Sequence, residues 1–350
     1  MIEHLLKKKV PLKQRKNPAV SFGLYLTALA DRPFMRRAAE KAKLYRALYN
    51  EENVSAVKRD MIRTYIREGY YPDEYVDFAF FSRTPAVRED YVSHPELLDR
   101  FYRSGKNTFP RDKYERYRLV SKYFHREVLR FRFDGSDREK EEYRRFTASN
   151  DAFIIKPLKG TKGRGIEILS SADYPEIDLL AKRAEGEVLA EELIRQGKEL
   201  ALFHPQSINT LRFVSAMTAD EQYTPLYALL RCGQGGAVVD NVGAGGIVSL
   251  VDLESGTIIS DGLFNHRYFE IHPDTQIRFR GAQIPEWPAL LALAEEIHRS
   301  IPKQMLIGWD FAWSEAGWEL VEINPAPSFS SWQALAGKGI RPLLRQHHLL

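Results

Sequence analysis

The strongest constraint on the fold is a change of pattern near residue 150. From about residue 32 to 132, apolar residues recur at three- and four-residue steps among many charges, which predicts helices. Beyond residue 150, short runs rich in Val, Ile, Phe and Tyr alternate with turn residues, which predicts strands. The expected strands are FIIKP, GIEIL, VLAEELI, TLRFVSAMT, YTPLYALLR, GGIVSLVDL, GWDFAW and WELVEIN. We therefore expect an α+β fold with a helical N-terminal region.

The expected helices have recognisable ends. Pro33–Tyr49 has proline in its first turn, and the run SAVKRDMIRTYIREGYY stops its periodicity at Gly69. Residues 110–131 read as a third helix, and FDGSDREKEEYRRF after it reads as a charged connector. Two later helices, DYPEIDLLAKRAE and EWPALLALAEEIHRSI, stand between the strands.

Composition excludes several classes of protein. The chain has 350 residues, of which 44% are hydrophobic and 28% charged, as in a globular protein with a sizeable core. Its 51 basic and 47 acidic residues leave too small an excess to argue for nucleic acid, so no nucleic-acid partner is expected. The single cysteine, Cys232, rules out an internal disulfide and fits a reducing compartment. We expect a cytoplasmic protein.

The N-terminus resembles a secretory signal, because the basic run Lys7–Asn17 precedes the apolar run Ala19–Ala30. Polar and small residues such as Ser21 and Gly23 interrupt the apolar run, so we favour a solvated basic tail followed by a helix. Weak contact with an anionic membrane surface is the other alternative. No run approaches the ~20 apolar residues that a membrane-spanning helix needs.

Phe153–Ile166 joins an apolar run to a loop of glycines and positive charges. Its cations are Lys156, Lys159, Lys162 and Arg164, and its glycines are Gly160, Gly163 and Gly165. The loop matches neither a Walker A sequence nor a dinucleotide fingerprint. A strand, a glycine-rich turn and a second strand can instead close backbone N–H groups around phosphate oxygens. The alternative is a solvated hairpin tip with incidental charge.

A second hairpin is predicted over residues 307–328. A three-residue loop at residues 315–317, with its glycine left-handed, would place Asp310 opposite Glu322. Asn324 would lie on the same face, two residues further on. Two carboxylates and an amide suit Mg²⁺. The alternative, acidic residues on a solvated face, is disfavoured because the surrounding residues are apolar.

These segments, taken together, resemble a known superfamily. FIIKP with KGTKGRGI, VLAEELI, SINTLRFVS, DNVGAGGI and GWDFAW with ELVEINPAPS look like the successive motifs of ATP-grasp proteins. The NTLR, R-x-G, DN-x-x-x-GG and HP-D-T patterns resemble the sugar-transfer-associated branch, over roughly residues 112–344. The resemblance implies two α+β subdomains that clasp ATP. It divides the chain into a helical accessory region (1–110) and a grasp domain (111–350), with a lid at about 150–195 and a catalytic subdomain at about 196–345.

The resemblance also implies nucleotide-binding roles. Lys113 and Lys156 would contact phosphates. A lid would close over them, formed by Lys159, Gly160, Thr161, Lys162, Gly163, Arg164 and Gly165. The hinge strand would read adenine with its backbone and hold the ribose with an acid, through Glu191, Glu192, Leu193 and Ile194.

The remaining roles implied by the resemblance concern metal and catalysis. One or two Mg²⁺ ions, with Mn²⁺ as an alternative, would be held by Asp310, Glu322 and Asn324. The transferred phosphate would be steadied by Arg212 and Arg231, with Asn241, Gly245 and Gly246 lining the same pocket.

Several of these residues have structural alternatives. Arg212 and Arg231 could be structural ion-pair partners, and residues 235–246 could form a plain flexible loop. His266 and His272 lack a third nitrogen or sulfur ligand, so a surface turn is preferred over a metal site, with an acceptor-side role as the alternative. Cys232 is expected in the core.

The resemblance implies an ATP-dependent ligase that activates a carboxylate as an acyl-phosphate for attack by an amine or thiol. The branch implies sugar-linked substrates in polysaccharide metabolism. A small-molecule or sugar kinase and a non-catalytic nucleotide-binding module are the alternatives.

Overall fold

The computed structural model describes residues 2, 12–102, 109–110, 112–158, 165–184, 186–236, 245–301 and 305–350. The chain forms two compact units. Unit 1 contains residues 1–107, 218–224 and 326–350, and unit 2 contains residues 108–217 and 225–325. No helix among the described residues is both long and apolar enough to cross a membrane.

Unit 1 is helical, as its sequence predicts. Its first helices are α2 (Leu12–Arg15), α3 (Pro18–Ala30), α4 (Arg32–Tyr49), α5 (Val54–Glu68), α6 (Pro72–Asp77), α7 (Pro85–Glu89) and α8 (His94–Phe101), with a 3₁₀ turn at Phe80–Ser82. α4 begins where the Asp31 carboxylate accepts a hydrogen bond from the backbone N–H of Phe34 (3.4 Å), and α5 ends at Gly69. The predicted helix at Pro33–Tyr49 is therefore confirmed.

Two C-terminal helices complete unit 1, namely α14 (Ser330–Ala336) and α15 (Arg341–Gln346). The buried Gln333 amide accepts from the Val92 N–H (2.8 Å) and donates to the Val92 carbonyl (3.1 Å). Arg341 donates to both oxygens of Glu96, at 2.7 and 2.8 Å. These contacts fix the last 25 residues to the N-terminal helices. The division into accessory region, lid and catalytic subdomain stays a proposal.

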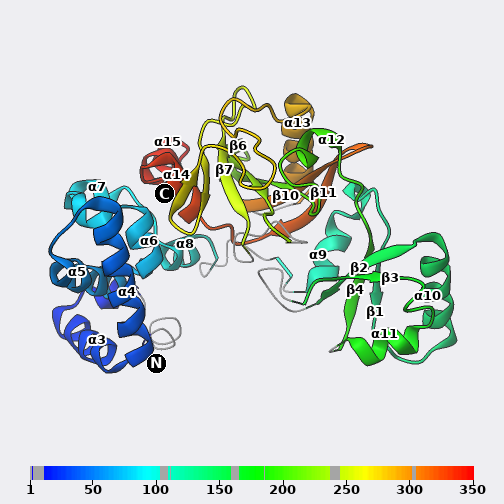
Figure 1. Cartoon of the computed structure of the whole chain (residues 1–350), viewed down its shortest axis with the longest axis horizontal. Coiled ribbons are helices and arrows are strands. Elements are labelled where there is room, and N and C mark those ends of the chain that lie inside the picture. Colours follow the sequence, from blue (N-terminus) through cyan, green and yellow to red (C-terminus); the bar gives the residue numbers. More distant parts are fainter. Residues whose placement is uncertain are drawn as a thin grey trace. The chain divides into compact units, whose positions relative to one another are not determined.

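Unit 2 contains two antiparallel sheets (Figure 1). The four-stranded sheet has the order β1-β4-β2-β3, with β1 (Val128–Phe131), β2 (Ala152–Pro157), β3 (Glu167–Ser170) and β4 (Val188–Glu192). Figure 1 shows α10 (Asp137–Ser149) and α11 (Ile177–Arg183) beside this sheet. Their apolar side chains join its core, including Tyr143, Phe146 and Leu180.

Two predictions fail in this part of the chain. The predicted helix at 110–131 is wrong, since α9 (Lys113–Leu119) and a 3₁₀ turn (Ser121–Tyr123) precede the strand β1. The Val128–Phe131 run pairs with β4, and this tertiary pairing overrides the helical periodicity. The predicted connector is also wrong, because it forms α10, whose first turn is capped by Ser136 accepting from the Glu139 N–H (3.2 Å).

The seven-stranded sheet has the order β11-β10-β5-β6-β7-β8-β9. Its strands are β5 (Thr210–Met217), β6 (Tyr223–Cys232), β7 (Ile247–Val251), β8 (Gly262–Phe264), β9 (Arg267–Phe269), β10 (Leu306–Ser314) and β11 (Gly317–Asn324), and its helices are α12 (Lys198–Ala201) and α13 (Trp287–Ser300). The buried Ser215 hydroxyl joins α13 to β10, since it lies 2.8 Å from both His298 Nδ1 and Trp309 Nε1. All eight predicted strands are present, and β1, β8 and β9 were not predicted.

The β10–β11 hairpin has an irregular register. Ser314 pairs with Gly317, so the predicted three-residue loop is wrong and the turn has two residues. Gly317 has a φ of +112°, a conformation that glycine adopts without steric cost. A bulge then leaves Val321 unpaired, and beyond it Asp310 pairs with Glu322. The predicted Asp310–Glu322 pair is therefore confirmed, although it arises from a shorter turn together with a bulge.

Candidate active site

The side chain of Lys156, on β2, extends toward the neighbouring strand β4. Its Nζ lies 2.8 Å from Oε2 of Glu191, which belongs to the neighbouring strand β4. The Glu191 side chain is 5% exposed and that of Lys156 is 13% exposed. The buried Glu191 carboxylate thus already has a cationic partner.

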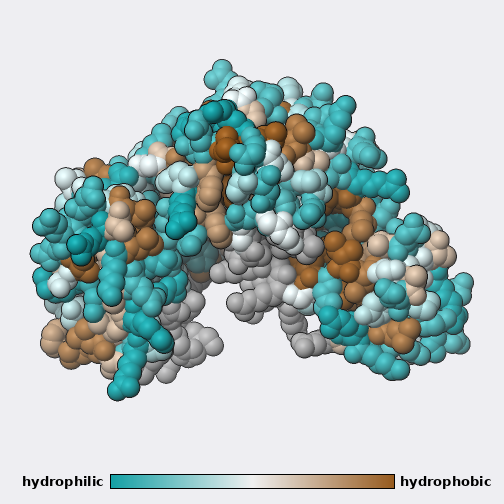
Figure 2. Space-filling view, in the orientation of Figure 1, coloured by the Kyte–Doolittle hydropathy of each residue, from teal (hydrophilic) through white to brown (hydrophobic). Residues whose placement is uncertain are grey.

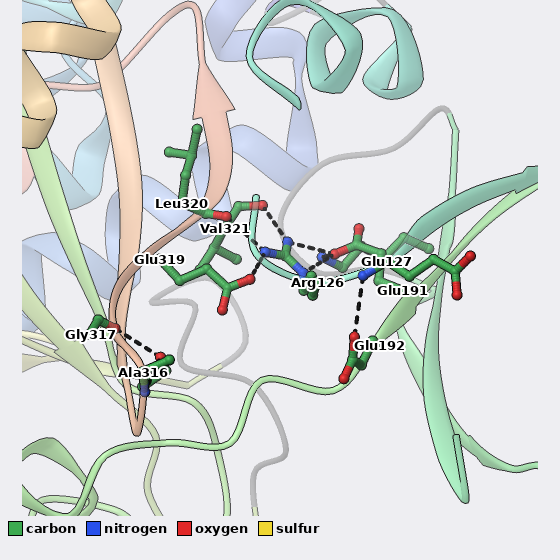
Figure 3. A network of polar contacts seen from close by, with 11 residues as sticks. Arg126, Glu127, Glu191, Glu192, Ala316, Gly317, Glu319, Leu320 and Val321 are labelled. Carbon is green, nitrogen blue, oxygen red and sulfur yellow. Dashed lines mark hydrogen bonds and ion pairs between the residues drawn. The ribbon is translucent and has the colours of Figure 1, made fainter. Parts of the chain in front are cut away.

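Arg126 joins the small sheet to β11 of the large sheet (Figure 3). It donates to the Glu191 carboxylate from Nη2 (2.7 Å) and to the Glu319 carboxylate from Nη1 (2.7 Å). It also donates to the carbonyls of Leu320 (2.8 Å) and Val321 (3.2 Å). β11 is at an edge of its sheet, so Arg126 satisfies backbone acceptors that no further strand pairs with.

The charges of this cluster determine each other's protonation. Burial alone would raise the pKa of Glu191, but the charges and hydrogen bonds of Lys156 and Arg126 lower that pKa to about 2. Burial would lower the pKa of Arg126, but Glu191 and Glu319 raise it above its ordinary value. Glu191 and Arg126 therefore both stay charged at neutral pH.

A pocket opens beside this cluster, within unit 2. Its cations are Lys113, Arg116 and Lys156, and its acids are Glu191 and Glu322. Its apolar wall consists of Tyr117, Phe124, Val128, Leu189, Val321 and Ile323. Burial lowers the pKa of Lys113, Glu322 opposes this shift, and the nearby charge of Lys156 adds to it. Three cations around one partly apolar hollow favour a ligand that combines a flat apolar part with anionic groups.

A second charged cluster lies on the large sheet around the buried Asp310. Arg212, opposite Asp310 on β5, holds both of its carboxylate oxygens, with the Nη2–Oδ2 distance being 3.1 Å. Arg231 Nη2 lies 3.1 Å from Oδ2, and the same guanidinium donates to the Thr210 hydroxyl (2.7 Å). Asn324 donates to Oδ2 as well (2.9 Å). The structure thus brings together four of the predicted site residues.

The side chains around Asp310 offer carboxylate and amide oxygens, which are the ligand types that Mg²⁺ prefers. Glu322 lies directly across the hairpin from Asp310, and Asn324 contacts the Asp310 carboxylate, so these three side chains share one face. Among the described residues, no group of three or more His, Cys, Asp or Glu side chains could hold a metal ion. A site here would therefore consist of two carboxylates and an amide oxygen.

Stability should fall in acid because of Glu191 and Asp310. Burial would raise the pKa of Asp310, but Arg212 and Arg231 lower it to about 2, as Lys156 and Arg126 do for Glu191. Folded pKa values below the unfolded ones of 3.8 and 4.5 give stabilisation that is fully present above about pH 4.5. We expect that stabilisation, roughly 2–3 kcal/mol for each carboxylate, to disappear as the pH falls from about 4.5 through 2.

Urea unfolding at a series of pH values measures this loss. Glu191→Gln should remove about half of this pH dependence, because Asp310 still contributes its share. Glu167→Gln removes a carboxylate from an exposed ion pair with Arg183 and should leave the dependence unchanged. A wild-type unfolding free energy that stays constant across this pH range would contradict the prediction.

Several predicted residues lie outside the described residues, namely Lys159, Gly160, Thr161, Lys162, Gly163, Arg164 and Asn241. Gly165 has a φ of +72° and follows this gap. Glu192 ends β4, where its N–H donates to the Glu127 carbonyl (3.0 Å) and its carboxylate accepts from the Glu127 N–H (3.3 Å). Leu193 and Ile194 follow it and are half-buried.

The HPDT motif, which contains His272, forms hydrogen bonds to the chain around Gly233. His272 is completely buried, so the surface-turn interpretation is wrong for it, and its Nε2 donates to the Gly233 carbonyl (2.8 Å). His204 bonds the Gly235 carbonyl through Nε2 (3.0 Å) and Ser207 through Nδ1 (2.8 Å). Gly233 packs so closely that a Cβ there would lie 2.5 Å from the Ser207 hydroxyl. Both histidines thus fix the stem of the segment that leads to residues 237–244.

Two further residues bear on the sequence interpretation. Cys232 is completely buried, as predicted for a core residue. Arg126 was not predicted at all, because its carboxylate partners lie 65 and 193 residues away and no local pattern marks them.

The sugar-transfer associated ATP-grasp family matches residues 134–348, more than half of the chain. None of the curated proteins compared with the chain matches it.

Similar solved structures include an N5-carboxyaminoimidazole ribonucleotide synthetase in complex with ADP (11% identity, TM-score 0.39, covering 75% of this chain and 54% of that one). D-alanyl-alanine synthetase A from Vibrio cholerae (11%, 0.38, 66% and 60%) and D-alanine–D-alanine ligase from Bacillus anthracis (11%, 0.39, 67% and 64%) are similar too. The chain thus spans less than two thirds of the length of these proteins. The family match confirms the resemblance inferred from the motifs, and the chain belongs to the sugar-transfer associated ATP-grasp family.

Proposed function

We propose that this chain is an ATP-dependent ligase, which phosphorylates a carboxylate and joins it to an amine or thiol. The observation that carries the proposal is the arrangement of charges along the β10–β11 hairpin. Glu322 lines the pocket that also contains Lys113 and Lys156, and it pairs across the hairpin with Asp310, which Arg212 and Arg231 contact. Cations for phosphates and an acidic pair for a metal suit phosphoryl transfer.

The pocket beside Lys156 is the proposed nucleotide site. Lys113 and Lys156 supply positive charge for the phosphates of ATP, and the apolar wall suits a flat base. Because Arg126 and Lys156 occupy the Glu191 carboxylate, we assign adenine recognition to the backbone of residues 191–194. The lid at 159–165 remains a proposal from the sequence, with its glycines and cations closing over the phosphates.

Asp310, Glu322 and Asn324 are the proposed ligands of Mg²⁺. A bound ion would neutralise charge on the phosphate oxygens and orient them. Asp310 is ionised at neutral pH, because Arg212 and Arg231 lower its pKa to about 2 despite its burial. A cation could therefore bind it without a proton leaving first, but it would have to share the carboxylate with Arg212, Arg231 and Asn324, or displace them.

Arg212 and Arg231 are the proposed phosphate-steadying groups on the acceptor side. Planar guanidinium groups can hold two oxygens of a phosphoryl group at once. Asp310 fixes the orientation of both side chains, so they need little rearrangement when the acyl-phosphate forms. The amine then attacks the carbonyl carbon, the C–O bond to phosphate breaks, and free phosphate leaves. Asn241 would line the same site.

The family's association with sugar transfer supports a sugar-linked carboxylate or amine as substrate. A screen of such pairs with ATP and Mg²⁺, following ADP, free phosphate and product mass, tests the proposal. A ligase releases ADP and phosphate in equal amounts and forms an amide or thioester. A stable phosphorylated product without free phosphate would establish a kinase instead, and ATP binding without turnover of any pair would favour a non-catalytic module.

Glu322→Gln tests the metal site. This substitution removes a ligand charge at nearly constant shape, so it should abolish turnover and also the rise in melting temperature that Mg²⁺ produces with a non-hydrolysable ATP analogue. The protein without ligands should keep its melting temperature. Thermal unfolding with and without Mg²⁺ measures both effects.

Glu315→Gln, at the exposed turn of the same hairpin, is the matched control and should behave as wild type. Turnover retained by Glu322→Gln would place the metal elsewhere. Unfolding of the ligand-free variant would make Glu322 a structural residue.

A further inference from the structure

The α3 helix exposes an apolar face. Its sequence, PAVSFGLYLTALA, contains no charged residue, yet only Leu24 and Ala28 are buried. Phe22, Leu26 and Leu29 are 64%, 51% and 44% exposed. Their spacing of four and three residues places them on one side of the helix, which we name the α3 face. Figure 2 shows the apolar surface over α3 at the lower left.

Exposed cations stand at both ends of α3. Lys13 and Lys16 precede the helix, and Arg32 and Arg36 follow it, all with exposed side chains. The one acidic residue between positions 12 and 39 is Asp31, which is buried and accepts from the Phe34 N–H. The described sequence around the α3 face is thus mainly basic, although the exposed Glu68 at the end of α5 interacts with the charge of Lys16.

We propose that the α3 face docks on the surface of an anionic lipid bilayer. Phe22, Leu26 and Leu29 would enter the boundary between headgroups and acyl chains, while the flanking cations contact lipid phosphates. The helix has 13 residues, whereas about 20 are needed to span a bilayer, so it would lie in the plane of the surface. This inference concerns unit 1 and is independent of the proposed ligase reaction.

Size and charge favour a bilayer over a second copy of the chain. A stable protein interface needs about 800 Å² from each partner, and three partly exposed side chains offer well under half of that. A second copy would also bring the same four cations, whose charges repel. An anionic bilayer instead combines an apolar interior with negative phosphates. The free energy of burying the apolar side chains and that of attracting the cations, each small, then add together.

Vesicle flotation with the full-length protein tests the proposal. We expect binding to vesicles of phosphatidylcholine with phosphatidylglycerol and little binding to phosphatidylcholine alone. Raising the salt from about 0.1 to 1 M should weaken binding, because the Debye length shortens from about 10 to 3 Å. Wild-type protein that stays unbound with anionic vesicles would overturn the proposal.

Two double variants separate the apolar and electrostatic contributions. Phe22→Ser with Leu26→Ser should lower the partition coefficient more than about ten-fold, because buried apolar area is lost. Lys13→Gln with Lys16→Gln should lower it about five-fold for each cation removed. Matched controls remove exposed residues of unit 2 and should bind as wild type: Leu119→Ser with Leu202→Ser, and Lys182→Gln with Lys198→Gln.

Self-association and misfolding give different results. A wild-type dimer in sedimentation velocity that Phe22→Ser with Leu26→Ser converts to a monomer would make the α3 face a contact between copies and overturn the proposal. Circular dichroism and affinity for an ATP analogue should match wild type in every variant. A folded Phe22→Ser, Leu26→Ser protein that floats as wild type would refute the role of the face.

Discussion

Lys156→Ala should weaken binding of a non-hydrolysable ATP analogue about 10- to 100-fold. The expected loss follows from removing one charged hydrogen-bond donor from phosphate oxygens, which contributes about 1.5–3 kcal/mol. The melting temperature should fall by only a few degrees, since Arg126 still neutralises the buried Glu191 carboxylate at 2.7 Å. Isothermal titration calorimetry and thermal unfolding measure the two effects separately.

Lys182→Ala is the matched control, because Lys182 lies at the exposed end of α11 beside the same sheet. It should leave both affinity and melting temperature unchanged. If Lys156→Ala kept full affinity, Lys156 would be a structural partner of Glu191 and the nucleotide site would have to lie elsewhere.

Arg126→Met should destabilise unit 2 by about 3–5 kcal/mol. The substitution removes the guanidinium from two buried carboxylates: Glu319 loses its cationic partner, and Glu191 keeps Lys156 alone. A buried charge without a partner is costly. It also leaves the carbonyls of Leu320 and Val321 without that donor. Urea unfolding at neutral pH measures the loss of stability.

Two comparisons establish the cause of this loss. Arg145→Met breaks an ion pair with Glu127 in which the arginine is 58% exposed, so it should cost less than about 1 kcal/mol. Adding Glu191→Gln and Glu319→Gln to Arg126→Met should restore part of the stability, because the uncompensated charges disappear. An Arg126→Met variant as stable as Arg145→Met would refute a structural role for the cluster.

Local chemistry in the sequence predicted the strands, the helix ends of unit 1 and the Asp310–Glu322 pair. The pair was predicted correctly only because two unpredicted features, the shorter turn and the bulge at Val321, offset each other in the register. The bulge at Val321 was not predictable, because a bulge depends on contacts from outside the strand pair. One such contact is Arg126, which donates to the carbonyls of Leu320 and Val321 on β11.

Other failures have the same origin. The Val128–Phe131 segment continues a helical pattern, and only its pairing with β4 makes it a strand. α10 is rich in charge, and its few apolar residues, Tyr143 and Phe146, identify a helix only once the small sheet exists to receive them. His272 follows turn chemistry in the sequence, but its burial depends on a loop nearly 40 residues earlier.

The bulge at Val321 has a consequence for how such chains diverge. Continuing the register of the turn without it would pair Asp310 with Val321 and place Glu322 on the opposite face of the sheet. One extra residue therefore decides whether the two carboxylates meet. Insertions and deletions in a hairpin are usually tolerated at its tip. In this hairpin, a gain or loss of one residue at the tip would shift the register and separate the two carboxylates, unless a second change in the strand restored the register. An alignment of related chains should therefore place the gap within the strand, at Val321, and keep the turn ungapped.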